Sequence, residues 1–118
     1  MLFLSNRVVI TGLGVVSPVG IGKEAFWDAM MSGKNGIDKI TRFDAAEYKA
    51  QIAGEVKDFD PADYMDKKES KRIDRYAQFA MAAAKLAVED AKLDLEQENL
   101  ERIGTFVGSG IGGIETMH

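Results

Sequence analysis

The stretch "VVITGLGVVSPVG", residues 8–20, decides the fold class of this chain. Its β-branched run, Val8 to Ile10, predicts a short buried strand over residues 7–11 that Gly12 closes. A strand that ends in Gly-x-Gly is also how a dinucleotide-binding unit begins. Gly12 and Gly14 therefore raise the question of a phosphate-binding loop, and the residues that follow them answer it.

A dinucleotide loop needs a helix that begins at once, and it needs an acidic residue after a second strand. Here Ser17 and Pro18 follow the glycines, and the next helical pattern begins only at Lys23. No second strand ends in an acid at the required distance, because Asp38 lies in a polar loop beside Gly36. A P-loop is excluded for want of a Gly-Lys-Ser/Thr ending. We interpret the glycines of this stretch as turn residues that let the chain fold tightly over a sheet edge.

The composition narrows the possible functions. The 118 residues fit one domain, and the net charge of −4 argues against general nucleic-acid binding. The sequence has no cysteine, which excludes disulfides, thiolate metal sites and a cysteine nucleophile within these residues. The single histidine, His118, is the last residue and is interpreted as exposed rather than catalytic. Without a signal h-region or an apolar run of roughly 18 residues, we expect a soluble, cytoplasmic protein with no membrane partner, metal or cofactor.

Strand and helix signals alternate along the chain. The pattern predicts these elements: a helix over Lys23 to Ser32, an edge strand over Gln51 to Val56, a turn at Asp60-Pro61, one long helix over Lys67 to Lys92, a second buried strand over Ile103 to Val107, and the first turn of a helix over Ile114 to His118. Between Tyr76 and Ala91 the long helix is apolar on nearly every side, which predicts that it is buried.

Strands that end in glycine and are separated by helices predict a layered α/β unit with parallel strands and right-handed crossovers. Two or three strands make a poor sheet, and so apolar a helix needs cover on several sides. We therefore expect this sequence to be the front portion of a larger protein.

Two features are candidates for function. The start of the long helix reads "KKESKRIDR", and its five cations fall on one helical face if the helix is continuous: Lys67, Lys68, Lys71, Arg72 and Arg75. Such a patch can bind an acidic partner, or it can be a solvated face paired with Glu69 and Asp74. The second feature is Ile111, a bulky side chain among the glycines of "GSGIGG", residues 108–113. It either gates a pocket or packs in an ordinary core.

Four motifs in order, "TGLGVVSPVG", "GKNGI", "KKESKRIDR" and "VGSGIGG", resemble the start of a β-ketoacyl-acyl carrier protein synthase. The resemblance runs from Arg7 to Met117, and only the opening "MLFLSN" departs from it. Each motif alone is weak, but the ordered set is specific. Within the family, "GSGIGG" is similar to the chain-elongating branch, synthase II.

The resemblance implies a thiolase-like layered fold, of which this chain is an incomplete N-terminal half, and a homodimer. It implies a decarboxylative Claisen condensation of an acyl-enzyme with malonyl-carrier protein, carried out by a cysteine and two histidines that lie beyond this sequence. The 118 residues alone are thus expected to be inactive. Lys68, Lys71 and Arg72 match the family's carrier-docking positions. Ile111, with Gly110 and Gly112 beside it, matches the position that lines the acyl pocket at the dimer interface.

Two alternatives stay open. Synthase-like chains without a nucleophile act as chain-length partners in polyketide systems, and a ketosynthase domain of a polyketide synthase has a similar start. The residue at the nucleophile position would separate the first from an enzyme: cysteine supports the condensing enzyme, and glutamine or serine supports the silent partner.

Overall fold

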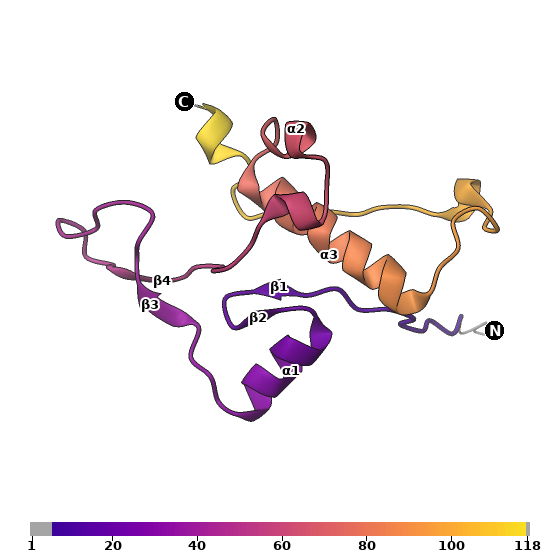
Figure 1. Ribbon diagram of the computed structural model, residues 1–118, viewed down its shortest axis with the longest axis horizontal. Helices are drawn as coiled ribbons and strands as arrows, with labels where there is room; N and C mark the ends of the chain where they lie inside the picture. The colour runs from indigo at the N-terminus through magenta and orange to yellow at the C-terminus, as the bar shows by residue number, and fades with distance from the viewer. Residues whose placement is uncertain (1–5, 118) are drawn as a thin grey trace, which may run out of the picture.

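The structure, a computed structural model, describes residues 6–117 and has a mixed α/β arrangement around one long helix (Figure 1). The elements in chain order are β1 (Val16–Ser17), β2 (Gly20–Ile21), α1 (Lys23–Met31), β3 (Ile37–Lys39), β4 (Ile52–Gly54), the 3-10 turn η1 (Pro61–Asp63), α2 (Lys67–Ser70), α3 (Arg75–Ala91), and the 3-10 turns η2 (Leu100–Arg102) and η3 (Ile114–Met117). The radius of gyration is 17.8 Å. A compact domain of about 100 residues has roughly 13 Å, so this chain is extended.

The deciding stretch forms a tight hairpin. β1 pairs antiparallel with β2 in the register Val16 to Ile21 and Ser17 to Gly20. The Ser17 hydroxyl donates to the Gly20 carbonyl at 2.8 Å and accepts from the Gly20 N–H at 3.2 Å, which holds the turn closed. The Gly22 N–H donates to the Val15 carbonyl at 2.8 Å, and α1 begins one residue later. A turn thus stands where a dinucleotide loop would place a helix.

Residues 12–14 lie directly on α3. A Cβ at Gly14 would overlap the Ala83 carbonyl oxygen and come within 2.7 Å of the Ala87 nitrogen. A Cβ at Gly12 would lie 2.7 Å from the Ala91 Cβ. The alanines of α3 leave room for the first segment, and only glycine at positions 12 and 14 lets the two backbones come this close.

A second hairpin packs on the first. β3 pairs antiparallel with β4, from Ile37–Gly54 to Lys39–Ile52. The predicted edge strand over 51–56 is confirmed as β4, whereas β3 was not predicted. Pro18, in the turn of the first hairpin, lies so close that a Cβ on Gly36 would come within 3.0 Å of its Cβ, and one on Gly54 within 3.1 Å of its Cγ.

The aromatic core sits where α3 begins. Phe59, 9% exposed, stacks on Tyr64 with ring centroids 5.6 Å apart and meets Phe79 edge-on at 5.0 Å. Asp60 caps the adjacent turn η1, whose first residue is Pro61, so the predicted turn at this dipeptide is confirmed. Few other apolar side chains are buried: Ala29, Ala45 and Ala82.

The single helix expected over 67–92 is wrong. It is divided into α2 and α3 by residues 71–74, and Asp74 adopts an extended conformation, φ −68° and ψ 159°. Asp74 is the N-cap residue of α3, but only its carbonyl caps the helix, by accepting from the N–H groups of Ala77 and Gln78, while its carboxylate accepts from the Thr116 hydroxyl. Within α3 only Ala82 is buried, so the described part of the chain does not supply the cover expected for this apolar helix, and its burial stays a prediction. The predicted helix over 23–32 is confirmed as α1.

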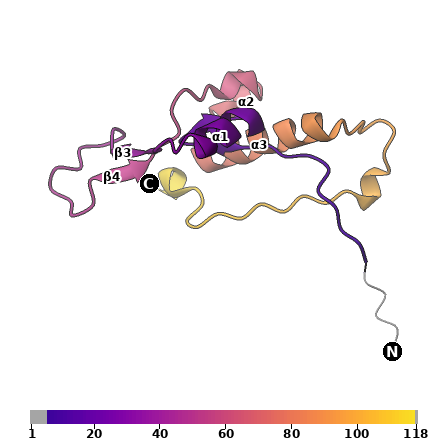
Figure 2. The ribbon, with the colours of Figure 1, turned by 90° about the horizontal axis from the view of Figure 1, so that it is seen from below.

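The two strands expected over 7–11 and 103–107 do not form in the described part of the chain, and both strand pairs there are antiparallel. Residues 12–14, which follow the first segment, run antiparallel to α3, with Gly12 beside Ala91 and Gly14 beside Ala83. The second segment runs toward the N-terminal end of α3, as Figure 2 shows, and no ladder joins the two segments. A strand needs a hydrogen-bonded neighbour and a covering layer. Val8 is 91% exposed and Phe106 99%, so that layer is lacking.

The described residues contain no helix that is both long and apolar enough to cross a bilayer. The expected helical turn at the end of the chain is the 3-10 turn η3, and His118 lies outside the described residues.

Candidate functional site

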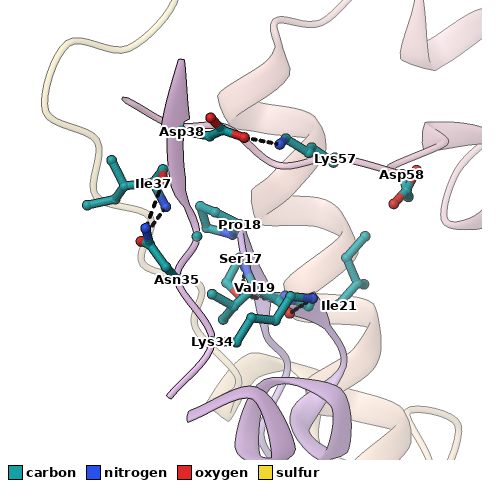
Figure 3. Close-up of a pocket in the computed structure, with 12 residues that line it drawn as sticks. Ser17, Pro18, Val19, Ile21, Lys34, Asn35, Ile37, Asp38, Lys57 and Asp58 are labelled. Atoms are coloured by element: carbon teal, nitrogen blue, oxygen red, sulfur yellow. Dashed lines mark hydrogen bonds and ion pairs between the residues drawn. The ribbon is translucent and has the colours of Figure 1, made fainter. Parts of the chain in front are cut away.

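A polar hollow lies between the two hairpins (Figure 3). It has a volume of about 610 Å³ and is lined by the turn of the first hairpin, residues 17–21, by residues 34–38, and by Lys57 and Asp58. Its cations have partners: the Lys34 ammonium donates to the Val19 carbonyl at 3.1 Å, and Lys57 pairs with Asp38 at 3.4 Å. Sequence reasoning gave no sign of this cavity, because the facing hairpins meet only through tertiary packing.

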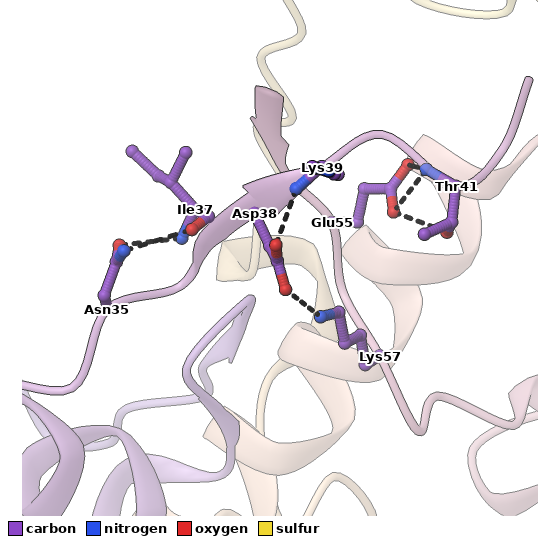
Figure 4. Close-up of polar contacts among 7 residues, drawn as sticks. All are labelled: Asn35, Ile37, Asp38, Lys39, Thr41, Glu55 and Lys57. Atoms are coloured by element: carbon purple, nitrogen blue, oxygen red, sulfur yellow. Dashed lines mark hydrogen bonds and ion pairs between the residues drawn. The ribbon is translucent and has the colours of Figure 1, made fainter. Parts of the chain in front are cut away.

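The carboxylates of Asp38 and Glu55, beside the cavity, accept hydrogen bonds from backbone N–H groups (Figure 4). Asp38 accepts from the Lys39 N–H at 2.7 Å, and this bond together with the Lys57 ammonium holds the pKa of Asp38 below its usual value. Glu55 accepts from the Thr41 hydroxyl at 2.7 Å and from the Thr41 N–H at 3.0 Å, which lowers the pKa of Glu55. A general acid needs a pKa raised toward neutrality, so neither carboxyl is poised for proton transfer at pH 7.

The described residues show no metal-binding cluster. Across positions 6–117, no three histidine, aspartate or glutamate side chains lie together as a metal site would require. The sequence has no cysteine, and the carboxylates with shifted pKa values are all shifted downward.

The predicted basic face is changed by the break between α2 and α3. Lys68 is on α2, Lys71 and Arg72 are in the linker, and all three are exposed. We call these three cations the basic patch. None of them forms an ion pair with another residue of the described range. The patch is thus a local concentration of unpaired positive charge on a chain of net charge −4.

Arg75 does not belong to that surface, which corrects the one-face prediction. Its guanidinium carbon lies 4.9 Å from the centroid of the Phe79 ring and 5.4 Å from that of Phe59. Its Nη2 donates to the Val56 carbonyl at 3.1 Å. Arg75 therefore fastens the start of α3 to the aromatic core through a cation–π arrangement.

The glycine segment 108–113 is open at Gly108, Gly110 and Ile111, whereas a Cβ at Gly113 would overlap the carboxylate of Asp74. Ile111 is 73% exposed, and a Cβ added at Gly108 or Gly110 would meet nothing within 4 Å. Gly112 has φ +77°, a conformation that other residues rarely adopt. The structure therefore brings Ile111 into no pocket, and its predicted role in substrate binding stays a prediction, as do those of Gly110 and Gly112.

A cluster around Asp90 was missed at the level of sequence. Its carboxylate is paired with the Lys23 ammonium and accepts from the Leu13 N–H at 3.0 Å. These contacts lower the pKa of Asp90 and raise that of Lys23. An acidic residue in the last turn of a helix is unfavourable beside the negative end of the helix dipole. The position of Asp90 could therefore have indicated from the sequence that it has a cationic partner. The cluster joins the first segment and α1 to α3.

Comparison with known proteins agrees with the resemblance. Residues 5–118 match the family described as "Beta-ketoacyl synthase, N-terminal domain". The chain is 50% identical over 112 residues to 3-oxoacyl-[acyl-carrier-protein] synthase 2 of Staphylococcus aureus strain COL, covering 95% of this chain and 27% of that protein. The enzyme of the same name from Synechocystis sp. is 46% identical over 112 residues, with the same coverage of 95% and 27%.

Two solved structures are similar. The ishigamide ketosynthase/chain length factor aligns with a TM-score of 0.70 and 39% identity, over 76% of this chain and 22% of that one. A type II PKS acyl-carrier protein in complex with its ketosynthase aligns with a TM-score of 0.57 and 31% identity, over 79% and 21%. The chain thus spans about a quarter of the length of the proteins it matches, 27% for the curated relatives.

Proposed function

The chain belongs to the β-ketoacyl synthase family, and we propose that it is the N-terminal part of a 3-oxoacyl-[acyl-carrier-protein] synthase of fatty-acid elongation. The observation that carries this proposal is the 50% identity to synthase 2 over 95% of the chain. The parent enzyme acts in the cytoplasm as a homodimer. Its substrates are acyl and malonyl thioesters of acyl carrier protein.

The proposed reaction is a decarboxylative Claisen condensation. A cysteine thiolate attacks the thioester of acyl-carrier protein, takes the acyl group and releases the carrier's thiol. Malonyl-carrier protein loses carbon dioxide, and the resulting carbanion attacks the acyl-enzyme thioester and expels the cysteine thiolate. Backbone N–H groups stabilise the oxyanion that forms. Because the 118 residues contain no cysteine, the nucleophile belongs to the remainder of the parent enzyme, and the chain alone is inactive.

The basic patch docks the carrier protein in this proposal. Its three cations are exposed and unpaired within the described residues, whereas the nearby Asp74 carboxylate accepts from the Thr116 hydroxyl at 2.6 Å. Carrier proteins are acidic, and complementary charge raises the rate of encounter and sets orientation. One similar solved structure is itself a complex of a carrier protein with its ketosynthase.

Ile111 and its neighbours Gly110 and Gly112 line the acyl pocket in this proposal. An exposed β-branched side chain on a glycine backbone gains free energy by packing against an acyl chain or a second subunit. The positive φ of Gly112 supports a backbone shape that keeps Ile111 turned outward.

The test is an assay of the full-length synthase that contains residues 1–118, given acyl-carrier protein and malonyl-carrier protein. We expect a 3-oxoacyl product that requires the malonyl substrate. In a variant with Lys68, Lys71 and Arg72 changed to Glu, the KM for acyl-carrier protein should rise by about tenfold or more, because three attractions become repulsions. The KM for a carrier-free acyl-pantetheine thioester should change little. Equal losses with both substrates would contradict docking at the patch, and an absence of product from the unaltered enzyme would contradict the function.

A second function is favoured by one observation. The similar structure with a TM-score of 0.70 is a ketosynthase/chain length factor. A chain-length partner that lacks the nucleophile, or a ketosynthase domain of a polyketide synthase, would share this N-terminal part. The sequence of the full-length protein distinguishes the chain-length partner from the enzyme. If glutamine or serine stands at the nucleophile position and the assay gives no product, the enzyme function is rejected in favour of the chain-length partner.

A further inference from the structure

The side-chain amide of Gln78 joins the two ends of the linker between α2 and α3. Its Nε2 donates to the Ser70 carbonyl at 2.8 Å and to the Ile73 carbonyl at 3.3 Å. Both partners are carbonyl oxygens, which only accept, so the nitrogen of the amide must face them. An amide nitrogen has two hydrogens, and this bridge uses both.

The bridged segment carries two of the three cations of the basic patch. Lys71 and Arg72 lie between the two carbonyls that Gln78 holds. The preceding helix, α2, has only four residues and is too short to be stable by itself. Asp66 caps its start by accepting from the Lys68 N–H at 2.8 Å, and Gln78 satisfies the carbonyl of its last residue. Within the linker, the Arg72 N–H donates to the Glu69 carbonyl of α2 at 2.9 Å, and the positions of the cations depend otherwise on contacts made outside α2.

We propose that Gln78 is a positioning residue for carrier-protein docking, holding Lys71 and Arg72 in one arrangement without touching the carrier itself. The inference rests on the proposed docking function of the basic patch. Charge complementarity fixes the orientation of a partner only if the charges themselves are held in place. Ordering the linker before binding removes an entropic cost that would otherwise be met in the complex. Loss of the bridge leaves every charge present but lets the linker adopt other conformations.

The test uses the full-length synthase with Gln78→Met, which keeps a side chain of similar length and removes both donors. The KM for acyl-carrier protein should rise by about threefold to tenfold, the loss expected for one or two neutral hydrogen bonds. For acyl-pantetheine, kcat and KM should stay within about twofold, because the carrier surface is not used. A purely structural role would lower kcat with both substrates, and that result would overturn the inference.

A second variant keeps the test decisive if the methionine protein does not fold. Gln78→Glu retains the shape of the side chain and also lacks the amide donors. Its carboxylate would face two carbonyl oxygens and lie close to the basic patch. It should raise the KM for acyl-carrier protein at least as much as Gln78→Met, and an unchanged KM would overturn the inference.

The chain offers a matched control in Gln51. Its Nε2 also donates to two backbone carbonyls, those of Ala46 at 3.1 Å and Tyr48 at 3.3 Å, but in the loop between β3 and β4. Gln51→Met should therefore leave the KM for both substrates unchanged. A rise equal to that of Gln78→Met would show that loss of any such bridge loosens the protein, and the specific role of Gln78 would be rejected.

The charge-reversed variant of Lys68, Lys71 and Arg72 separates the two proposals. If it raises the KM for acyl-carrier protein and Gln78→Met does not, docking stands and the positioning role fails. If the charge reversal has no effect on that KM, docking at the patch fails, and the role of Gln78 fails with it.

Discussion

Residues 12–14 and residues 108–113 are both glycine-rich and both follow an extended apolar segment, yet their surroundings are opposite. A Cβ at Gly14 would overlap the backbone of α3, whereas one at Gly108 or Gly110 would meet nothing within 4 Å. In the first segment the missing side chain is what allows contact, and in the second it leaves the backbone free at Gly108 and Gly110, up to Gly113, which lies against Asp74. Similar glycine patterns therefore serve close packing at one place and an open loop at the other.

The two segments also differ in what holds them. Leu13, between the packed glycines, donates its N–H to Asp90, 77 residues away in sequence. Within 108–113, the Gly112 N–H donates to the Ser109 hydroxyl at 3.0 Å, a local bond. The first segment is thus anchored by tertiary contacts along its length, whereas the second has a local bond at its glycines and meets α3 only at its end, where Gly113 and Thr116 lie against Asp74.

The largest expected effect comes from adding one methyl group to the packed segment. Gly14→Ala should lower the free energy of unfolding of the full-length synthase by about 2–3 kcal/mol, because the new Cβ would meet carbonyl and amide atoms of α3 that cannot rotate away. The matched Gly108→Ala should change it by less than about 0.5 kcal/mol. Urea denaturation measures both. Equal losses would remove the contrast between the segments.

A smaller effect, on specificity rather than stability, is expected in the open segment. Ile111→Phe in the full-length synthase should shorten the acyl chains accepted, with kcat/KM for the longest substrates falling by about tenfold, as for a pocket that loses one or two methylenes of space. Ile114→Phe, at an exposed isoleucine of η3, is the control and should leave the profile unchanged. Product analysis across acyl-carrier substrates measures this. If Ile111→Phe does not change the acyl chain-length profile, the role of Ile111 in the acyl pocket is rejected and only a packing role remains.

The smallest effect concerns the anchor of the packed segment. The Lys23 ammonium, and after it the Leu13 N–H, lower the pKa of Asp90 in the folded state. A lowered folded pKa stabilises the protein above the ordinary carboxyl pKa, and this stabilisation is lost as the pH falls through the lowered value. Asp90→Asn should therefore be less stable than the unaltered protein at pH 7, with the difference shrinking in acid and at high salt.

Urea denaturation at several pH values measures that difference. Asp94→Asn is the control, because its carboxylate accepts from the Glu96 N–H and pairs with no cation among the described residues. A stability difference for Asp90→Asn that does not change with pH would show that the ion pair contributes nothing to the anchor.

Local features were predictable because they depend on neighbouring residues. The spacing of Ala25, Phe26 and Ala29 predicted α1 to within one residue, and Asp60-Pro61 predicted a turn that the structure confirms as η1. The ordered motifs identified the family, and the match over residues 5–118 confirms it. The rejection of a phosphate loop also holds, since Ser17 closes a hairpin turn where a helix would have to start.

What failed depended on partners distant in sequence. Val8 to Ile10 have the composition of a strand, but a strand exists only beside another, and no described segment pairs with them. Arg75 had the spacing of a surface cation, yet the rings of Phe59 and Phe79 hold it inward. Gln78 reads as an ordinary polar residue on an alanine-rich helix until Ser70 and Ile73 are brought to its amide.

The sequence by itself determined the family, α1, the edge strand β4 and the presence of clustered cations before α3. These follow from residue type and short-range spacing, which the chain carries in any conformation. The interpretation of Gly12 and Gly14 as turn residues was wrong, because both lie against α3 and the turn is formed by residues 17–20. Only the tertiary structure decided which glycines are pressed against a helix, which arginine is withdrawn from the basic patch and which glutamine orders the rest of it. Those outcomes depend on contacts between residues distant in sequence, and such contacts exist only once the chain has folded.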